Sequence, residues 1–360
     1  MLKLTEPTFL ANIHFMPSKF INILGIETSC DETAAAVVAD GRVVKSSVVA
    51  SQTKLHEKYG GVVPEIASRA HIEKIYPVIT EAIAQAKVGK DDIDAIAVAN
   101  QPGLTVALMV GVTAAKTLAF VWQKPLIAIN HLHAHLQSAL LQENGLELPA
   151  VALIVSGGHT SLYDYHSPLE PRLLGCTIDD AAGEAFDKVA SILKLSYPGG
   201  PAIEKIAKQG NPKAIKFPRS MLGKDSLDFS FSGIKTAVLY YCRGQDMKGQ
   251  DKVDSMSAEQ IADIAASFQA AVVEVLIKKT QRAAERIDAK TILLGGGVAA
   301  NAELRTALQR MCDSSSPAKK LLVAPKQYCT DNAVMVASLA YHKFKASLFA
   351  DLTLEPKASG

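Results

Sequence analysis

Apolar and polar positions alternate along the chain in short blocks that predict paired strands near its beginning. Residues 21–28 are apolar and rich in β-branched side chains, and a polar turn over residues 29–32 separates them from a second apolar run over residues 33–39. Asp40-Gly41 follows this run and is a strong hairpin signal. The pattern therefore predicts antiparallel strands that open a sheet.

The same unit of strand, polar turn and strand returns near the middle of the chain. Residues 151–155 form an apolar run, residues 156–159 (Ser-Gly-Gly-His) a tight turn, and residues 160–165 a returning strand. Residue identity between the two units is low, so the repeat is one of architecture. We expect an internal duplication.

The remaining periodicity predicts helices and strands in alternation, which favours an α/β fold. Pro77 predicts a break or kink inside the first helix, and Gly199-Gly200-Pro201 predicts a loop. The predicted helices cover residues 65–86, 106–122, 131–141, 258–287, 301–311 and 332–344. The further predicted strands cover residues 93–99, 126–129, 291–294 and 321–324.

Composition narrows the class of protein. The chain has 360 residues, of which 48% are hydrophobic and 21% charged, which is typical of a globular protein with two domains. No run of about 18 apolar residues occurs, so we expect no membrane span. Five widely spaced cysteines without a CxxC pair fit a reducing cytoplasm. The net charge of +2 does not by itself indicate nucleic-acid binding, so any such site must be a local patch.

The segment His131 to His135 gives the strongest chemical signal, with three histidines in five residues. His131 and His135 are four residues apart, which places them on one helix face with Cβ atoms about 5–6 Å apart, close enough to share a metal ion. Asp331 is the candidate oxygen ligand, although an Asp at a helix start is often only an N-cap. The HExxH pattern of zinc peptidases is absent, which argues against peptidase chemistry.

Glycine turns give the second signal. They lie at residues 156–158, 199–200 and 295–297, each at the end of a predicted element. Glycine lets backbone N–H groups approach a phosphate, and a helix N-terminus adds favourable charge. Neither a P-loop nor a GxGxxG pattern occurs. The turns suggest a nucleotide held between two lobes, and Asn301 either reaches its base or ribose or only caps a helix.

Acidic side chains give the third signal. Asp31 and Glu32 lie in the first predicted turn, and Asp187 lies in a predicted helix between Phe186 and Val189. Such charges ordinarily form solvated surface. Asp187, with its apolar neighbours, could instead meet a ribose hydroxyl.

Long motifs also occur in a fixed order between residues 21 and 344. Through them the chain resembles the TsaD family, the transferase subunit of tRNA N6-threonylcarbamoyladenosine synthase, formerly called O-sialoglycoprotein endopeptidase or glycoprotease. The opening motif resembles the bacterial and organellar branch. The motifs cover residues 25–33, 59–65, 131–135, 155–160, 179–187, 197–201, 229–235, 295–301 and 329–332.

The resemblance implies a two-lobed fold of the actin, Hsp70 and sugar-kinase kind, a duplicated RNase H-like fold with ligand and metal in the interlobe cleft. The first lobe would cover residues 21–130, completed by residues from about 325 to 350, and the second residues 131–324. Residues 1–20 have no counterpart in the family pattern, and regular patterning starts only at Ile21. We expect an N-terminal extension, disordered or a non-native start with Met16 as an internal start, and a weak transit peptide or a natural tail are the alternatives. The implied reaction transfers threonylcarbamoyl from threonylcarbamoyl-adenylate to N6 of adenosine 37, giving t6A in tRNAs that read codons beginning with A.

The resemblance also implies site residues. His131, His135 and Asp331 would bind one Fe²⁺ or Zn²⁺ per subunit. Family members often carry Asp where this chain has Glu204, so a ribose contact there is in doubt. The adenylate would contact a set of residues from the glycine turns and nearby helices, namely Ile154, Val155, Ser156, Gly157, Gly158, Asp187, Gly200 and Asn301.

The implied chemistry needs no protein nucleophile, because the acyl carbon of a mixed anhydride is already activated. A base could help to remove the N6 proton, and Asp31, Glu32 and His133 are the candidates. The low net charge suggests that tRNA binding needs helper subunits. The resemblance implies a TsaB-like paralogue and a TsaE-like small ATPase, with a homodimer as a further option and no membrane partner.

Two other functions compete with the transferase. A metal-dependent ATPase or kinase of the same fold would also use the glycine turns, but such enzymes hold Mg²⁺ on carboxylates and waters, whereas two histidines suit iron or zinc. A non-catalytic scaffold would be expected to have lost the metal ligands, which this chain retains.

Overall fold

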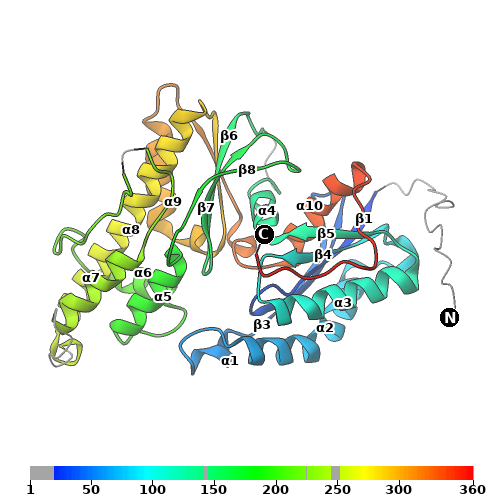
Figure 1. The fold of residues 1–360 in the computed structure, drawn as a ribbon, viewed down its shortest axis with the longest axis horizontal. Helices are drawn as coiled ribbons and strands as arrows, with labels where there is room; N and C mark the ends of the chain where they lie inside the picture. The colour runs from blue at the N-terminus through cyan, green and yellow to red at the C-terminus, as the bar shows by residue number, and fades with distance from the viewer. Residues whose placement is uncertain (1–19, 142–144, 224, 245–251, 360) are drawn as a thin grey trace, which may run out of the picture.

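Two five-stranded sheets form the framework of the protein (Figure 1). The computed structural model describes residues 20–141, 145–223, 225–244 and 252–359, so the predicted extension over residues 1–20 lies almost wholly outside the described residues. The first sheet contains β1 (Asn22–Glu27), β2 (Glu32–Ala39), β3 (Val43–Ser51), β4 (Ala95–Gln101) and β5 (Leu126–Asn130). The second contains β6 (Ala150–Val155), β7 (Thr160–Tyr165), β8 (Arg172–Cys176), β9 (Thr291–Gly295) and β10 (Lys320–Val323).

Both sheets have one topology. Their strand orders are β3-β2-β1-β4-β5 and β10-β9-β6-β7-β8, which are equivalent when one sheet is read in reverse. β1 pairs antiparallel with β2 and parallel with β4, just as β6 pairs antiparallel with β7 and parallel with β9. The predicted α/β class and internal duplication are confirmed.

The helices follow the predicted periodicity with two differences. The first long helix runs through Pro77 without a break, and Gly199-Gly200-Pro201 begins a helix instead of forming a loop. Pro201 lies in the first turn of that helix, where a missing N–H loses no helical bond. The helices of the described residues are α1 (Thr53–Glu57), α2 (Pro64–Ala86), α3 (Thr105–Trp122), α4 (His131–Ser138), α5 (Ala182–Ile192), α6 (Gly199–Ala207), α7 (Ser232–Arg243), α8 (Ala258–Arg286), α9 (Ala302–Asp313) and α10 (Ala333–Lys345), with four short 3₁₀ segments.

The sheets and helices stack in layers. Helices α2 and α3 cover one face of the first sheet, and α10 covers the other. The second sheet packs against α5, α8 and α9 on one face and against α4 on the other. Because α4 also contacts α10, these two helices lie between the sheets (Figure 1). We call the first sheet with α2, α3 and α10 the first lobe, and the second sheet with α5 to α9 the second lobe.

Helix α4 contacts strands of both sheets. A lobe boundary at residue 131 therefore stays a prediction.

Two of the helices, α3 and α8, are long and apolar enough to cross a membrane by length and composition. The sequence expectation missed them because each carries scattered polar residues. One apolar face of each helix joins a core on the sheets: Val112 and Ala115 of α3 pack on the first sheet, and Phe268 and Val272 of α8 on the second. The opposite face of α3 exposes Met109 and Val121. Helices α3 and α8 are core helices of the two lobes.

The end of the chain crosses the first lobe and returns to the space between the sheets (Figure 1). Ala350 forms a bridge with Leu126. Further on, the Lys357 N–H donates to the Asn100 carbonyl at 2.8 Å, and the Gly103 N–H donates to the Ala358 carbonyl at 3.2 Å. Backbone hydrogen bonds thus fix the last described residues beside β4.

Helix α10 approaches β1 very closely at Gly25. A Cβ atom at this position would lie 2.5 Å from the Ala333 carbonyl oxygen and 2.9 Å from the Ala337 Cβ atom. Ala333 is the first residue of α10. Glycine is therefore required here for the start of α10 to sit against the sheet.

We predict that Gly25→Ala destabilises the protein by about 1–3 kcal/mol, because the added methyl group must push α10 away from β1. The measurement is the midpoint of urea unfolding. Gly61→Ala is the matched control, since its Cβ would meet nothing within 4 Å. Equal midpoints for Gly25→Ala and the parent would contradict this account of the packing.

Candidate metal centre and ligand cavity

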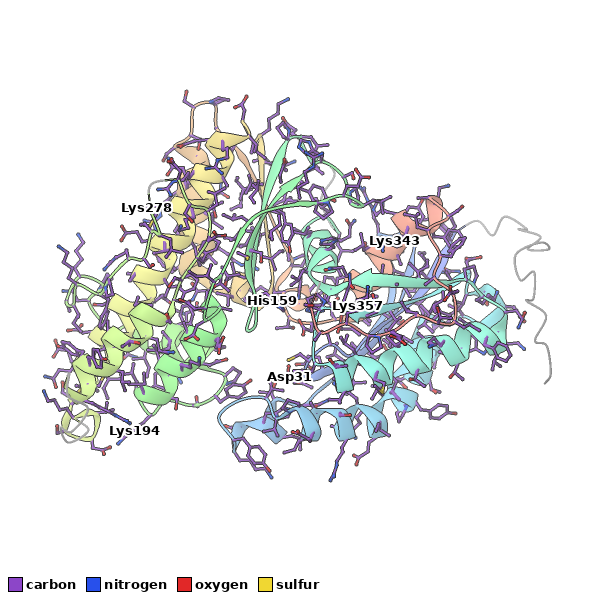
Figure 2. The ribbon with its side chains drawn as sticks, viewed as in Figure 1. Asp31, His159, Lys194, Lys278, Lys343 and Lys357 are labelled. Atoms are coloured by element: carbon purple, nitrogen blue, oxygen red, sulfur yellow. The ribbon has the colours of Figure 1, made fainter. Side chains whose placement is uncertain are left out.

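A cavity of about 550 Å³ opens between the lobes and gathers most of the predicted site residues. Asp31 from the first lobe and His159 from the second face the same space (Figure 2). A larger open groove between α8 and α9 contains none of them. The predicted residues that line the cavity are Asp31, Glu32, His131, Ser156, Gly157, Gly158, Asp187, Gly200, Asn301 and Asp331.

Helix α4 begins at the first histidine because Asn130 caps it. The Asn130 side-chain oxygen accepts hydrogen bonds from the backbone N–H groups of Leu132 at 2.9 Å and His133 at 3.1 Å. His131 and His135 then lie one turn apart, with ring centroids separated by 4.6 Å. Both rings are buried between the lobes.

Asp331 meets both rings from the segment before α10. Its Oδ1 atom lies 3.1 Å from His135 Nε2 and 3.5 Å from His131 Nε2. Asn332 supplies the cap of α10 by accepting from the Met335 N–H at 3.0 Å, so the Asp331 carboxylate is not used as the N-cap. One ligand atom from each of the three residues lies within 4.8 Å of the others.

The sequence interpretation missed Glu27, which orients His131. Glu27 is fully buried at the end of β1, and its Oε2 atom lies 2.9 Å from His131 Nδ1. The Ser29 N–H donates to Glu27 Oε1 at 2.5 Å, which fixes the carboxylate. With Nδ1–H donated to Glu27, the Nε2 lone pair of His131 is left for a metal ion. An acidic residue ending an apolar strand was the available signal.

The charges in this cluster favour a cation. Burial would lower the pKa of His131, but the Glu27 and Asp331 carboxylates raise it to about 9. Burial opposes ionisation of Asp331, yet the two histidines hold its pKa well below the usual range. Two imidazole nitrogens and one carboxylate form a donor set that zinc and iron(II) both accept. The buried group could therefore hold one metal ion.

His133 lies on the other side of α4. Its ring packs edge-on against Tyr163, with 5.8 Å between centroids. Burial and the nearby Lys343 lower the pKa of His133 to about 4. A residue two positions from His131 and His135 cannot share their helix face, so the structure places this candidate base outside the cavity.

Asp31 and Glu32 form an acidic pair on the cavity wall. Burial raises the pKa of both carboxyls, that of Glu32 to about 8 despite a hydrogen bond from Ser51 Oγ at 2.8 Å. Glu32 Oε2 is buried and has no hydrogen-bond partner among the described residues. A carboxyl group with a pKa of about 8 is ionised in only a fraction of the molecules at physiological pH, but in that form it is a stronger base than an ordinary carboxylate.

His159, another residue that the sequence interpretation did not assign, also lines the cavity. Burial and the nearby His131 lower the pKa of His159 to about 4. Its imidazole is therefore neutral and can accept a hydrogen bond from a ligand.

The glycine turns present bare backbone to the cavity. A Cβ atom added to Gly157, Gly158 or Gly200 would meet nothing within 4 Å. At Gly183 the reverse holds, because a Cβ would lie 2.5 Å from the Ser156 carbonyl oxygen. The start of α5 is thus packed against the turn, and the Gly183 N–H donates to that carbonyl at 3.2 Å.

Of the other residues predicted to contact the adenylate, Asp187 and Asn301 line the cavity, whereas Ile154 and Val155 do not. Asp187 lines the cavity and accepts from the Gly199 N–H at 2.7 Å, which anchors the start of α6. Asn301 caps α9 through its oxygen and donates one amide hydrogen to Gln269 at 2.9 Å, which leaves one hydrogen for a ligand. Ile154 and Val155 are core residues of β6 and do not line the cavity.

Comparison with known proteins identifies the family. The family model described as TsaD, tRNA N6-adenosine threonylcarbamoyltransferase, matches residues 43–338. The tRNA N6-adenosine threonylcarbamoyltransferase of Moorella thermoacetica is 51% identical over 333 residues, which cover 92% of this chain and 95% of that protein. The protein of the same name from Rhodopirellula baltica is 51% identical over 347 residues, with the same coverage.

The chain belongs to the TsaD family. It is a tRNA N6-adenosine threonylcarbamoyltransferase, which forms t6A by transfer of a threonylcarbamoyl group to a tRNA adenosine. The resemblance drawn from the motifs is confirmed, and so is the acyltransferase class.

Solved structures support the fold alone, because sequence identity to them is low. T. kodakarensis HypF matches with a TM-score of 0.59 and 14% identity, covering 92% of this chain and 50% of that one. Component A of the Acidaminococcus fermentans (R)-2-hydroxyglutaryl-CoA dehydratase matches with a TM-score of 0.51 and 17% identity, covering 90% and 98%. The predicted two-lobed fold of the actin and sugar-kinase kind is confirmed.

We predict that Glu27→Gln weakens metal binding by about 10- to 100-fold, because His131 loses the carboxylate that orients its ring and raises its basicity. Zn²⁺ titration with a competing chelator measures the affinity. His133→Ala is the control from the same helix and should bind as the parent does. Unchanged affinity in Glu27→Gln would show that the Glu27 contact does not support the metal centre.

Proposed function

We propose that the cavity between the lobes holds threonylcarbamoyl-adenylate beside the metal centre and admits adenosine 37 of tRNAs that read codons beginning with A. The observation that carries this proposal is that His131 and Asp331 line the same cavity as the open glycine turns, with His135 in contact with both of them. An anticodon-loop adenosine can enter such a pocket because single-stranded bases are free to unstack.

The adenylate is proposed to lie on the second lobe. Ser156, Gly157 and Gly158 would face its phosphate with bare backbone. Asp187, Gly200 and Asn301 would contact the ribose and base. The open space at Gly157, Gly158 and Gly200 supports this placement, because side chains there would fill the room that the nucleotide needs.

His131, His135 and Asp331 would hold one Fe²⁺ or Zn²⁺. Such an ion supplies Lewis-acid stabilisation of carbonyl and phosphate oxygens. Ile154 and Val155 support the neighbouring turn from the core of β6 and are not proposed to touch the ligand.

Acyl transfer then needs orientation and removal of one proton. Adenosine N6 forms a bond to the carbamoyl carbon, the bond from that carbon to the phosphate oxygen breaks, and AMP leaves with the electron pair. We propose that the acidic pair Asp31 and Glu32 accepts the N6 proton, because both line the cavity and the pKa of Glu32 is raised to about 8. His133 is excluded from this role by its position.

Helper subunits are proposed to assist tRNA binding, since the net charge is only +2. A TsaB-like paralogue and a TsaE-like small ATPase are the candidates, and we propose that they act with this protein in the cytoplasm.

Helices α2 and α3 lie side by side, because the Ser68 hydroxyl of α2 donates to the Val106 carbonyl of α3 at 3.4 Å. Ile72 and Tyr76 on α2 and Met109 on α3 are exposed. We propose that this apolar surface binds a helper subunit.

The competing functions are less well supported. A kinase-like Mg²⁺ site would be built on carboxylates and waters, whereas this cluster presents two imidazoles. A scaffold would have no need for the buried ligands that Glu27 orients. Family membership favours the transferase over both.

We predict that the protein, given synthetic threonylcarbamoyl-adenylate, both helper subunits and unmodified tRNA that reads codons beginning with A, produces threonylcarbamoyladenosine. Nucleoside analysis by mass spectrometry measures the product. His135→Ala should lose at least about 100-fold in rate, while His133→Ala should stay active. Leaving out the helper subunits should lower turnover. Full activity of His135→Ala would rule out the proposed role of the metal centre.

We predict that the transfer rate rises as pH increases through about 8, because Glu32 must be deprotonated to accept the N6 proton and its raised pKa delays deprotonation to that range. Glu32→Gln should abolish this limb of the pH profile and lower the rate by about 100-fold or more. Glu57→Gln, on the exposed face of α1, is the control. A pH profile of Glu32→Gln that matches the parent would exclude Glu32 as the base.

A further inference from the structure

A buried chain of hydrogen bonds lies next to the site loop, the turn between β1 and β2 that carries Cys30 and Asp31 and leads into Glu32 at the start of β2, and the proposed mechanism does not use it. Its members are His56 of α1, Gln52 before α1 and His71 of α2. His56 and His71 are 0% exposed, and Gln52 is 2% exposed. Buried polar groups of this kind are costly unless each has its partner.

The direction of each bond follows from its ends. The Cys30 carbonyl can only accept, so His71 Nε2, 3.0 Å away, must carry hydrogen. Burial lowers the pKa of His71, so the ring is neutral and its Nδ1 accepts. The one lone pair of Nδ1 is shared by two donors, Thr33 Oγ1 at 2.8 Å and Gln52 Nε2 at 3.3 Å.

The other end of the chain is fixed in the same way. The Val63 N–H can only donate, and it points at His56 Nδ1 at 3.3 Å. His56 Nε2 therefore carries hydrogen and donates to Gln52 Oε1 at 3.2 Å. The bonds run in one direction, from Val63 through His56, Gln52 and His71 to Cys30.

This chain holds one carbonyl group of the site loop, and the backbone of Gln52 holds the next one. His71 binds the Cys30 carbonyl, and the Gln52 backbone N–H donates to the Asp31 carbonyl at 3.0 Å. These hydrogen bonds fix the backbone on the side away from the cavity. Cys30, Asp31 and Glu32 all line the cavity. Figure 2 shows Asp31 at the edge of the first lobe that faces this space.

We propose that Gln52, His56 and His71 are positioning residues, which set the place of the Asp31–Glu32 pair in the cavity. This inference rests on the proposed role of that pair in proton removal. None of the three residues lines the cavity itself, so their effect passes through the Cys30 and Asp31 backbone. The hydrogen-bond chain also gives a role to the motif at residues 59–65, because the Val63 N–H of this motif is the first donor of the hydrogen-bond chain.

The kinetic test compares His71→Phe with His71→Gln. Phenylalanine fills the space without a donor, whereas the glutamine amide nitrogen can take the place of Nε2 and donate to the Cys30 carbonyl. We expect His71→Phe to lower kcat by about 10- to 100-fold through misplacement of the loop, with KM for the adenylate and zinc content unchanged. His71→Gln should recover most of kcat. His342→Gln, a control at a half-buried histidine on α10, should match the parent.

A second readout does not depend on catalysis. The Cys30 thiol lies on the held loop, and the only other partly exposed thiol among the described residues is Cys176 of β8. We expect His71→Phe and Gln52→Met to speed alkylation of Cys30 by iodoacetamide at least fivefold, with Cys176 unchanged, as measured by peptide mass spectrometry. Folded fraction is checked by circular dichroism.

The results separate the two proposals. If the parent forms no threonylcarbamoyladenosine, the proposed function fails, and Cys30 alkylation still tests the loop. If the parent is active but His71→Phe keeps its kcat and its Cys30 reactivity, the positioning role is overturned. Equal loss of kcat in His71→Phe and His71→Gln would also overturn it, because the role then is not that of a donor to Cys30.

Discussion

The contact of the Asp331 carboxylate with two imidazoles packed edge-on is the interaction on which the site depends. His131 and His135 come from α4, and Asp331 comes from the turn before α10. These two helices lie between the sheets, and Gly25 lets α10 start directly against β1. The duplicated sheets thus do not carry the ligands themselves. They fix two helix starts so that Asp331 meets two histidines far from it in sequence, in a buried cluster that contains the carboxylates of Glu27 and Asp331.

The strongest signals in the sequence, the histidine pair His131 and His135 and the glycine turns, belong to the cavity and metal centre that the structure contains. Histidines four residues apart can be read from the sequence because helix geometry alone brings them together, whereas the distance to Asp331 depends on the packing of α10. Glu27 could not be assigned, because only the fold shows that the end of β1 reaches His131. His133 illustrates the opposite limit: a dense motif suggested a role, but helix geometry turned its ring toward Tyr163. At Pro77, tertiary packing outweighed a local helix-breaking preference.

The two lobes contribute different chemical groups to the cavity wall. The second lobe offers bare backbone at Gly157, Gly158 and Gly200, which suits a phosphate or nucleotide. The first lobe offers carboxyls whose pKa values are raised by burial, which suits a proton acceptor. No nucleophile is required for an activated acyl donor. Geometry therefore matters more than intrinsic reactivity, and this is the reason that a buried, uncharged hydrogen-bond chain under one loop can bear on the rate.

The backbone bonds at Asn100 and Gly103 have a practical consequence for handling the protein. They hold the last described residues beside the site, and Ala358 itself forms part of the cavity wall. A purification tag or fluorescent fusion placed after these residues would therefore emerge beside the cavity that we propose admits the tRNA adenosine. Such a fusion would crowd the cavity in binding assays without touching any catalytic group, and a tag in an exposed surface loop away from the cavity would avoid that artefact.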